Sequence, residues 1–416
     1  MNTTRRQALQ SLGLGGLAML TGQTPLLAKG SRKKLPVAAV VTTYRENSHA
    51  DVIVGKILEG WRQKGGDGPG LELVSLYTDQ VESGDLSRGL AKKHGIPLAK
   101  TIDEAVTLGQ NSLPVACVLS IGEHGNYPRS EFGQTMYPRR RFFDEIVAAM
   151  QRCGEYVPLF NDKHLAWNWS DAKHMYDTAE RHGIPFMAGS SLPVAWRYPA
   201  KDLPVGSEIE EAMVVGYGGL ESYGFHALEA LQCIVERRSG GETGVAAVTV
   251  VKGDQIWQAE KEGKWDRQLL VSALETFDAS ADDLEQRLRP KDSAFYLIEY
   301  RDGLRATCAM LNGVIGQKAV ACRVRGQSKP FSCWFRLEEN KPFGHFEHLL
   351  RGIQHMVHTS QPAYPVQRTL LTTGILDRVM HSLHQDGQRL PSPELAISYQ
   401  PSKWDFANLH EENFPS

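Results

Sequence analysis

Three short segments of the sequence each bring a histidine close to an acidic residue. They are residues 123–127 (EHGNY), 161–166 (NDKHLA) and 221–226 (ESYGFH). Imidazole and carboxylate groups can transfer protons near neutral pH, and the same groups bind divalent cations. No contiguous metal-binding pattern such as HExxH is present, so the sequence leaves acid–base catalysis and metal-assisted catalysis both open.

The polar segments in the first half of the chain follow apolar runs that are typical of buried parallel strands. The expected strands are residues 35–42, 71–77, 115–121, 156–160 and 184–188, and the expected helices are residues 49–63, 86–94, 139–152 and 170–182. This alternation predicts an α/β fold with a Rossmann-like, doubly wound parallel sheet in a domain of residues 35–198. Ligands bind such sheets beyond the carboxyl ends of the strands, where His49 follows the first strand.

The pattern changes after about Pro199. Helical periodicity is expected at residues 221–237, 346–358 and 369–384, and strands at residues 245–252, 294–300, 305–311, 319–325 and 331–337, with a hairpin turn at residues 301–303. Consecutive strands predict an α+β domain with a largely antiparallel sheet over residues 199–416, whose closing helices can pack back on the first domain. The histidines at 345, 348, 355 and 358 recur at helical spacing and are interpreted as surface or dimer-interface residues.

Composition excludes several classes of protein. The chain has 416 residues, with 46 lysines and arginines against 48 acidic residues, so its formal net charge is -2. This balance argues against a nucleic-acid partner. Six cysteines are too few for a disulfide framework and form no CxxC pair, which argues against a thiolate zinc site. Cys322 and Cys333 can pair only if their strands are neighbours.

The first 30 residues are typical of an export signal. Arg5 and Arg6 precede an apolar run, residues 8–20, that is too short to span a bilayer, and the small residue Ala28 follows. The paired arginines predict the twin-arginine export machinery as a partner and a periplasmic or extracytoplasmic location, with no membrane span after signal removal. The alternative is a Sec signal or a membrane anchor with incidental arginines.

Four motifs resemble one known family over nearly the whole mature chain. Residues 71–80, 89–98 and 101–106 (LELVSLYTDQ, GLAKKHGIPL, TIDEAV) look like a unit that reads a cofactor ribose, with Asp79 near the acidic position. Residues 161–166 stand where that family has Glu-Lys-Pro, residues 224–226 match its Gly-x-His element, and residues 361–364 with 369–383 are similar to its closing helices. The family is that of the Gfo/Idh/MocA oxidoreductases, which includes glucose-fructose oxidoreductase and inositol dehydrogenase.

The resemblance implies an enzyme that oxidises or reduces a hydroxyl of a sugar or sugar acid with tightly bound NAD or NADP. It implies that Lys163 contacts substrate and nicotinamide, that His226 is the general acid or base, and that the second sheet forms a homo-oligomer interface. Together with the strand ends it gives the expected site: catalytic residues Lys163, His226, Asp162 and His164; cofactor-binding residues Tyr44, Arg45, Asp79, Glu123 and His124; and substrate-binding residues Tyr127, Arg129, Trp167, Arg197 and Tyr223.

Two departures from the family pattern keep other functions open. Residues 42–49 (TTYRENSH) contain none of the glycines that let a pyrophosphate approach the backbone, although the Arg45 fork could bind a phosphate. Ser222 stands where the family often has an aspartate near the histidine. The alternatives are a non-redox, metal-assisted carbohydrate lyase or hydrolase, with His124, Asp162 and His164 as candidate ligands of a divalent metal, and a catalytically silent sugar-binding protein.

Overall fold

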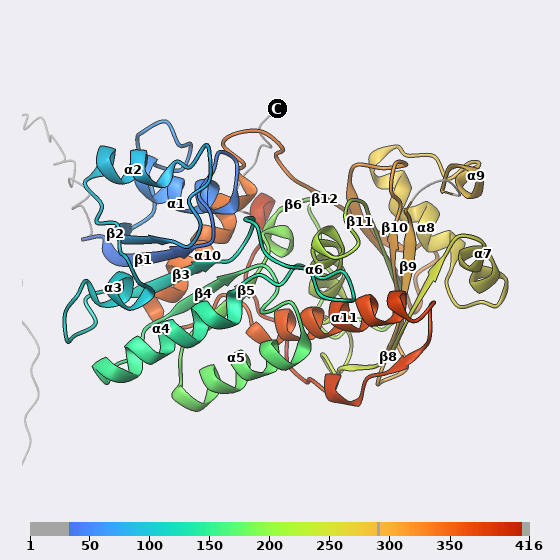
Figure 1. Cartoon of the computed structure of the whole chain (residues 1–416). Coiled ribbons are helices and arrows are strands. Elements are labelled where there is room, and N and C mark those ends of the chain that lie inside the picture. The colour runs from blue at the N-terminus through green and yellow to red at the C-terminus, as the bar shows by residue number, and fades with distance from the viewer. Residues whose placement is uncertain (1–32, 289–291, 410–416) are drawn as a thin grey trace, which may run out of the picture. The chain divides into compact units, whose positions relative to one another are not determined.

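The computed structural model describes residues 33–288 and 292–409, whose helices and strands are built around two sheets (Figure 1). The expected export signal, residues 1–30, lies outside the described residues. Within the described ranges, no helix is both long enough and apolar enough to cross a membrane.

The first sheet has five parallel strands in the order β2-β1-β3-β4-β5. The strands are β1 (Leu35–Val41), β2 (Leu71–Thr78), β3 (Cys117–Ile121), β4 (Leu159–Asp162) and β5 (Phe186–Gly189). The order of the strands confirms the predicted doubly wound sheet. β4 begins three residues later than expected, so Asp162 is the last residue of a strand rather than part of the loop that follows.

Helices cover both faces of this sheet because alternate strand residues point to opposite faces. Ala38 and Val40 pack with α3 (Ile102–Thr107), α4 (Arg139–Cys153) and α5 (Trp169–His182). Val37, Ala39 and Val41 pack with α1 (His49–Glu59) and with α10 (His345–Thr359), which joins this sheet from the far end of the sequence (Figure 1). The short helix α2 (Ser87–His94) lies beside β2.

The second sheet has eight strands in the order β13-β8-β9-β10-β7-β11-β12-β6. The strands are β6 (Trp196–Tyr198), β7 (Ile209–Gly216), β8 (Val245–Lys252), β9 (Ala294–Tyr300), β10 (Arg305–Met310), β11 (Lys318–Val324), β12 (Phe331–Arg336) and β13 (Leu390–Pro391). All pairs are antiparallel except β7 with β10, so the sheet is mixed. The predicted hairpin joins β9 to β10. β6 belongs to this sheet, although it lies inside the expected first domain; the exact domain boundary stays a prediction.

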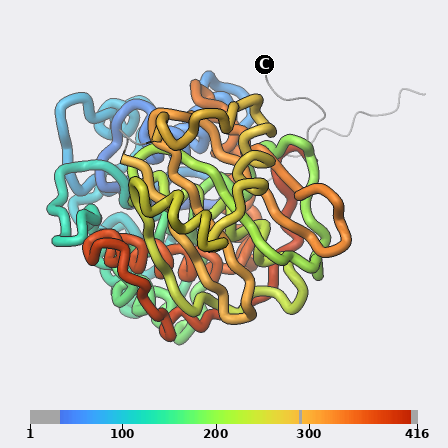
Figure 2. Tube along the Cα trace, turned by 90° about the vertical axis from the view of Figure 1, so that its right-hand side faces the viewer, coloured from blue at the N-terminus to red at the C-terminus, as the bar shows by residue number. Residues whose placement is uncertain are grey.

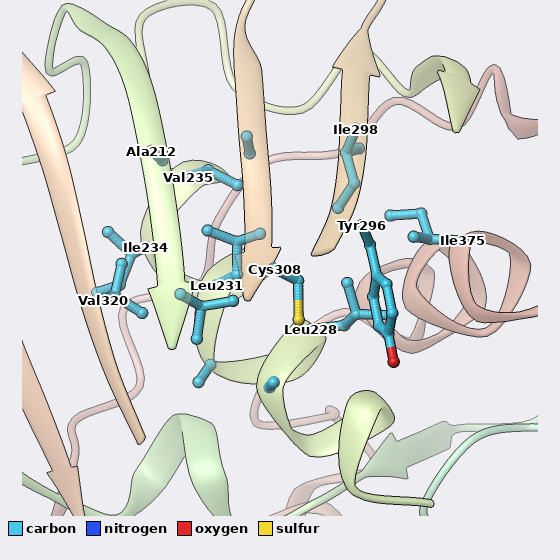
Figure 3. Packing of buried hydrophobic residues seen from close by; sticks show 14 of the residues in the cluster. Ala212, Leu228, Leu231, Ile234, Val235, Tyr296, Ile298, Cys308, Val320 and Ile375 are labelled. Carbon is cyan, nitrogen blue, oxygen red and sulfur yellow. The ribbon is translucent and has the colours of Figure 1, made fainter. Parts of the chain in front are cut away.

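One face of the second sheet packs against α6 (Ser222–Val235) and α11 (Val366–His384). In Figure 3, Leu228, Leu231 and Ile234 of α6 lie against side chains from the strands. Helices of 3-10 type occur at Leu192–Val194, Glu275–Phe277, Pro393–Leu395 and Ala407–Leu409.

The opposite face is covered by α7 (Asp254–Lys261), α8 (Arg267–Leu274) and α9 (Leu284–Leu288), which Figure 2 shows in yellow in front of the strands. Ile256, Leu269 and Leu270 pack there against Val215 and Phe295 of the sheet. The sequence analysis did not predict these three helices, and it therefore did not predict that this face of the sheet is covered. The homo-oligomer stays a prediction, and a sheet-to-sheet interface through this face would first require the helices to move.

The cysteines are all reduced. β11 and β12 are neighbours, as a Cys322–Cys333 disulfide would need, but Cys322 lies opposite Phe331 and Cys333 opposite Val320. Both thiols are buried in the core beside α6, where they pack as small apolar groups.

Candidate functional site

A cavity of about 900 Å³ lies at the carboxyl ends of β1, β3 and β4, where α6 and β11 also contribute to its wall. Seven of the predicted site residues line it: Glu123, His124, Arg129, Lys163, His164, Tyr223 and His226. His49, Arg139, Lys318 and His345 line it as well. The structure therefore brings the three histidine-and-carboxylate segments of the sequence to one place, as expected for a parallel sheet.

A buried ion-pair network forms the floor of the cavity. The Lys163 ammonium is bonded to Glu123 Oε1, and His49 Nδ1 lies 2.7 Å from Asp162 Oδ2 and 3.1 Å from Glu123 Oε2. Asp162 ends β4, and Lys163 then has a left-handed backbone with φ 64°, held by a hydrogen bond from its N–H to the Gly189 carbonyl. Strained backbone of this kind, uncommon outside glycine, persists where the surroundings hold it and is frequent at functional sites.

The charges of this network determine its protonation. Burial alone would raise the pKa of Glu123, but the charges of His49, Lys163 and His124 outweigh burial and lower that pKa well below its ordinary value. Glu123 is therefore a carboxylate at neutral pH. One oxygen of each carboxylate, Glu123 Oε2 and Asp162 Oδ1, is buried without a hydrogen-bond partner among the described residues.

His226 is a neutral imidazole. Burial, followed by the charges of Lys163 and Lys318, holds its pKa well below the ordinary value. In the part of the chain that the structure describes, no carboxylate lies within ion-pair distance of it, and its Nδ1 is buried without a partner. The absence of a carboxylate agrees with the serine at position 222. A neutral imidazole in a cavity can accept a proton from a bound hydroxyl group.

The predicted metal ligands do not form one site. His164 is buried, and its Nε2 accepts a hydrogen bond from Arg139 at 2.8 Å; burial and then the charges of Arg139 and Lys163 hold its pKa well below the ordinary value. His124 Nδ1 lies 2.9 Å from Arg45 Nη2. Both imidazoles thus offer one nitrogen to an arginine. Among the described residues, the ligand atoms of His124, Asp162 and His164 do not come together as the sequence analysis expected.

A different set comes together instead. His49, Glu123 and Asp162 each present a ligand atom, and these atoms lie within 4.8 Å of one another. Mixed nitrogen and oxygen donors of this kind suit Mn²⁺, Fe²⁺ or Zn²⁺. The signal for His49 in the sequence was its position at the start of the first helix, after the loop that follows the first strand.

The ribose-binding position of this fold is closed by the chain itself. The Asp79 carboxylate accepts hydrogen bonds from Tyr77 at 2.8 Å, from Tyr127 at 2.7 Å and from Arg141. Burial acts to raise the pKa of Asp79, but the hydrogen bonds from Arg141, Tyr127 and Tyr77 together outweigh it and lower that pKa. Asp79 is thus ionised and accepts three hydrogen bonds from the chain itself. Tyr127, which was predicted to contact the substrate, donates one of them.

The pyrophosphate position is also filled. Tyr44 is fully buried in the core between the first sheet and its helices, so it cannot contact a cofactor as predicted. Asp51, in the first turn of α1, accepts a hydrogen bond from the Asn47 N–H at 2.9 Å and pairs with Lys341 at 3.0 Å. A carboxylate therefore occupies the helix N-terminus that a phosphate would use, and these residues do not fit a dinucleotide in the usual pose.

Two other residues predicted to contact substrate do not line the cavity. Arg197 is buried, pairs with Asp202 at 2.9 Å and stacks on Phe406 at 4.3 Å, away from the cavity. Trp167 is not among the lining residues, and its carbonyl accepts a hydrogen bond from Gln134. Polar and aromatic residue types indicated binding at both positions, but in the structure Arg197 is held by packing partners and Trp167 lies outside the cavity wall.

The His345 side chain was expected at the surface, and it lies inside. It is buried at the cavity wall, and burial, with smaller contributions from His49, Lys56 and Lys318, lowers its pKa to about 3. His348 is buried as well, with its ring 5.2 Å from that of Trp196.

Solved structures share this architecture. GenD2 from gentamicin A biosynthesis, in complex with NAD, is similar with a TM-score of 0.55 and 17% identity, over 87% of this chain and 97% of its own. The chain has the fold of the Gfo/Idh/MocA oxidoreductases. The resemblance seen in the sequence is thus confirmed at the level of the fold.

Two further neighbours agree. A NAD-binding oxidoreductase from Klebsiella pneumoniae matches with a TM-score of 0.52 and 13% identity, over 86% of this chain and 99% of its own. An oxidoreductase from Agrobacterium radiobacter, in complex with NAD+, L-tartaric acid and magnesium, has the same TM-score and identity, over 86% and 98%. No protein-family profile and no curated protein sequence matches the chain.

Proposed function

We propose that this protein is an exported carbohydrate-acting enzyme of the Gfo/Idh/MocA oxidoreductase type, with a sugar or sugar acid bound in the cavity. The observation that carries the proposal is the Lys163–Glu123 pair beside neutral His226 at the carboxyl ends of the strands. The wall combines charged donors and acceptors with the tyrosine rings at 217 and 223, which suits a ring that carries many hydroxyl groups. Export by the twin-arginine route rests on residues 1–30 alone.

The chain's own residues supply the proton-transfer half of an alcohol–carbonyl interconversion. The Lys163 ammonium, held by Glu123, donates a hydrogen bond to the reacting oxygen and stabilises negative charge on it. His226 accepts the hydroxyl proton because its imidazole is neutral. Glu123 and Asp162 hold His49 at the edge of the same space.

The cofactor is where the comparisons and the geometry differ. Two of the solved neighbours are complexes with NAD, which supports NAD or NADP, a hydride carrier, for an enzyme of this fold. The ribose and pyrophosphate positions of this chain do not fit it, as shown by the engaged Asp79 and by Asp51 at the start of α1. No step is therefore assigned to the nicotinamide.

A second candidate is a non-redox, metal-assisted lyase or hydrolase. The His49–Glu123–Asp162 set favours it, because a divalent cation at those atoms would act as a Lewis acid on a sugar hydroxyl or carboxylate. In that case Lys163 would have to release Glu123 at least in part.

The experiment that separates the two is an inventory of bound groups. The protein is expressed with its signal, purified, denatured in acid and in alkali in parallel, and the released NAD(H) and NADP(H) are measured together with the metal content. Near-stoichiometric nicotinamide supports the oxidoreductase; stoichiometric metal without nucleotide, with turnover abolished by chelation, supports the second candidate.

Turnover of a panel of sugars and sugar acids, followed by mass spectrometry, completes the test. Lys163→Met should abolish product formation and lower the melting temperature, because Glu123 loses one of its cationic partners; activity is therefore measured at a temperature where the melting curve shows the variant to be folded. Lys173→Met is the matched control, because Lys173 is partly exposed on α5, lies outside the cavity wall and, among the described residues, pairs with Asp177. Product formation that survives Lys163→Met would refute the assignment of Lys163 under either candidate.

A further inference from the structure

Lys318 occupies a position that strand geometry directs into the cavity. It is the first residue of β11, where Val320 and Cys322 point toward α6 and pack in the core on that side. Alternation along the strand places Lys318 on the same face, two residues before Val320. The side chain is 3% exposed, and it lines the cavity.

The Lys318 ammonium has no acceptor among the residues that the structure describes. Among residues 33–288 and 292–409, no oxygen lies within hydrogen-bond or ion-pair distance of its Nζ. It lies instead over two tyrosine rings, 4.4 Å from the centroid of Tyr217 and 5.3 Å from that of Tyr223. Burial lowers its pKa to about 8, opposed by the charge of Glu339 and assisted by that of Lys163, so the amine remains mostly charged at neutral pH.

A buried charge without a partner is costly, and proteins rarely keep one without a use. The charge of Lys318 also acts on its neighbours in the cavity, because it contributes to lowering the pKa values of His226 and His345. Arg139 adds two more unsatisfied hydrogen-bond donors, because its Nε and Nη2 are buried at the cavity wall without acceptors among the described residues. An anionic group entering the cavity would satisfy these donors.

We propose that Lys318 binds the carboxylate of the molecule that occupies the cavity, so that the substrate is a sugar acid rather than a neutral sugar. The proposal rests on the proposed function, whose substrate class it narrows. A single ammonium over two aromatic rings matches a singly charged carboxylate. A phosphate dianion is bound more often by arginine forks and by successive backbone N–H groups.

The test compares ligands that differ by a carboxylate in place of a hydroxymethyl group. Thermal shift and calorimetric titration of the purified protein use glucuronate against glucose, galacturonate against galactose, and gluconate against glucitol, each at millimolar concentration, with glucose 6-phosphate as the phosphate arm. We expect one or more acids to bind and their neutral counterparts to bind more weakly. Lys318→Met should weaken acid binding by about ten- to hundredfold, the usual value of a hydrogen bond to a charged group.

Two controls keep the result clear. Lys318→Arg keeps the charge and should retain part of the acid binding, whereas Lys173→Met on α5 should bind acids as the wild type does. The proposal is overturned if neutral sugars bind as well as the acids, if only the phosphate binds, if no acid binds, or if Lys318→Met binds the acids unchanged. Acids that bind through Lys318 but are never converted would contradict the proposed enzyme and leave this subsite intact.

Discussion

A buried carboxyl group on α6 should make the stability of this protein depend on pH. Glu229 lies one turn beyond His226, where Thr372 donates a hydrogen bond to Oε1 at 2.8 Å and the Ser190 N–H reaches Oε2 at 3.3 Å. There is no room for water to take part on the Gly189 side, since a side chain at that position would collide with the carboxyl group. Burial raises the pKa of Glu229 from 4.5 to about 7, although Arg368 and the two hydrogen bonds oppose the rise.

The sign of the effect follows from proton binding. Between pH 4.5 and 7 the folded protein holds a proton on Glu229 that the unfolded chain releases, so the free energy of unfolding falls as the pH rises through this window. One pH unit is worth about 1.4 kcal/mol, which gives about 3 kcal/mol in all, of which about 2.5 kcal/mol falls between pH 5 and 8. Glu229→Gln has no proton to lose and should be free of this contribution.

The assay is urea denaturation of the wild type and Glu229→Gln at pH 5, 6, 7 and 8, with the slope of the transition checked for constancy. The variant should gain about 2.5 kcal/mol relative to the wild type between pH 5 and 8. Glu72→Gln, an exposed position on β2, is the control and should show no such gain. A difference between wild type and Glu229→Gln that stays constant with pH would refute the reasoning.

Three further results are expected. Lys318→Met should raise the free energy of unfolding of the ligand-free protein by about 1–3 kcal/mol in chemical denaturation, because it removes a buried charge that has no partner; a lower stability would contradict this. Arg368→Met should lower that free energy by about 3–5 kcal/mol, because in the wild type the guanidinium lies 2.8 Å from the buried Glu236 carboxylate, and the substitution leaves this charge without its cation. The double variant with Glu236→Gln should recover part of the loss. His226→Asn should reduce kcat by about 10²–10⁴-fold with a smaller change in KM, measured on any sugar acid found to be turned over, because a general base acts on the reacting proton.

Much of the fold could be predicted from the sequence because buried parallel strands have continuous apolar runs. β1, β8 and β9 lie within one residue of the predicted ranges for this reason. β7 was missed because acidic residues at 210 and 211 stand in its first half. Glu211 is paired there with Arg305 on the neighbouring strand β10 and lies opposite Arg323 on β11. α7 and α8 were missed because each has only eight residues, which is too short for a clear helical period, and they bury their apolar residues against a sheet face that the sequence does not reveal.

The site was predictable where its residues follow a strand directly. Glu123 and Lys163 each follow the end of a parallel strand, and the fold must bring those ends together. Lys318 begins a strand of the other sheet, and nothing near it in the sequence shows that its side chain faces the same cavity. Asp79 and Arg197 illustrate the opposite error, because their residue types indicate binding while packing partners in the structure engage them.

The position of α10 has a consequence for how this chain matures. Phe346, Leu349 and Ile353 of this helix complete the core on one face of the first sheet, yet they are synthesised about 150 residues after β5. The face of the first sheet that α1 covers only in part therefore stays incompletely covered until almost the whole chain has left the ribosome. Residues 35–198 expressed alone should aggregate through that face, whereas adding α10 back as a separate peptide should restore solubility. Because a helix from the last fifth of the sequence completes the core of the first sheet, any carboxyl-terminal truncation that removes α10 should also destabilise the amino-terminal part of the chain.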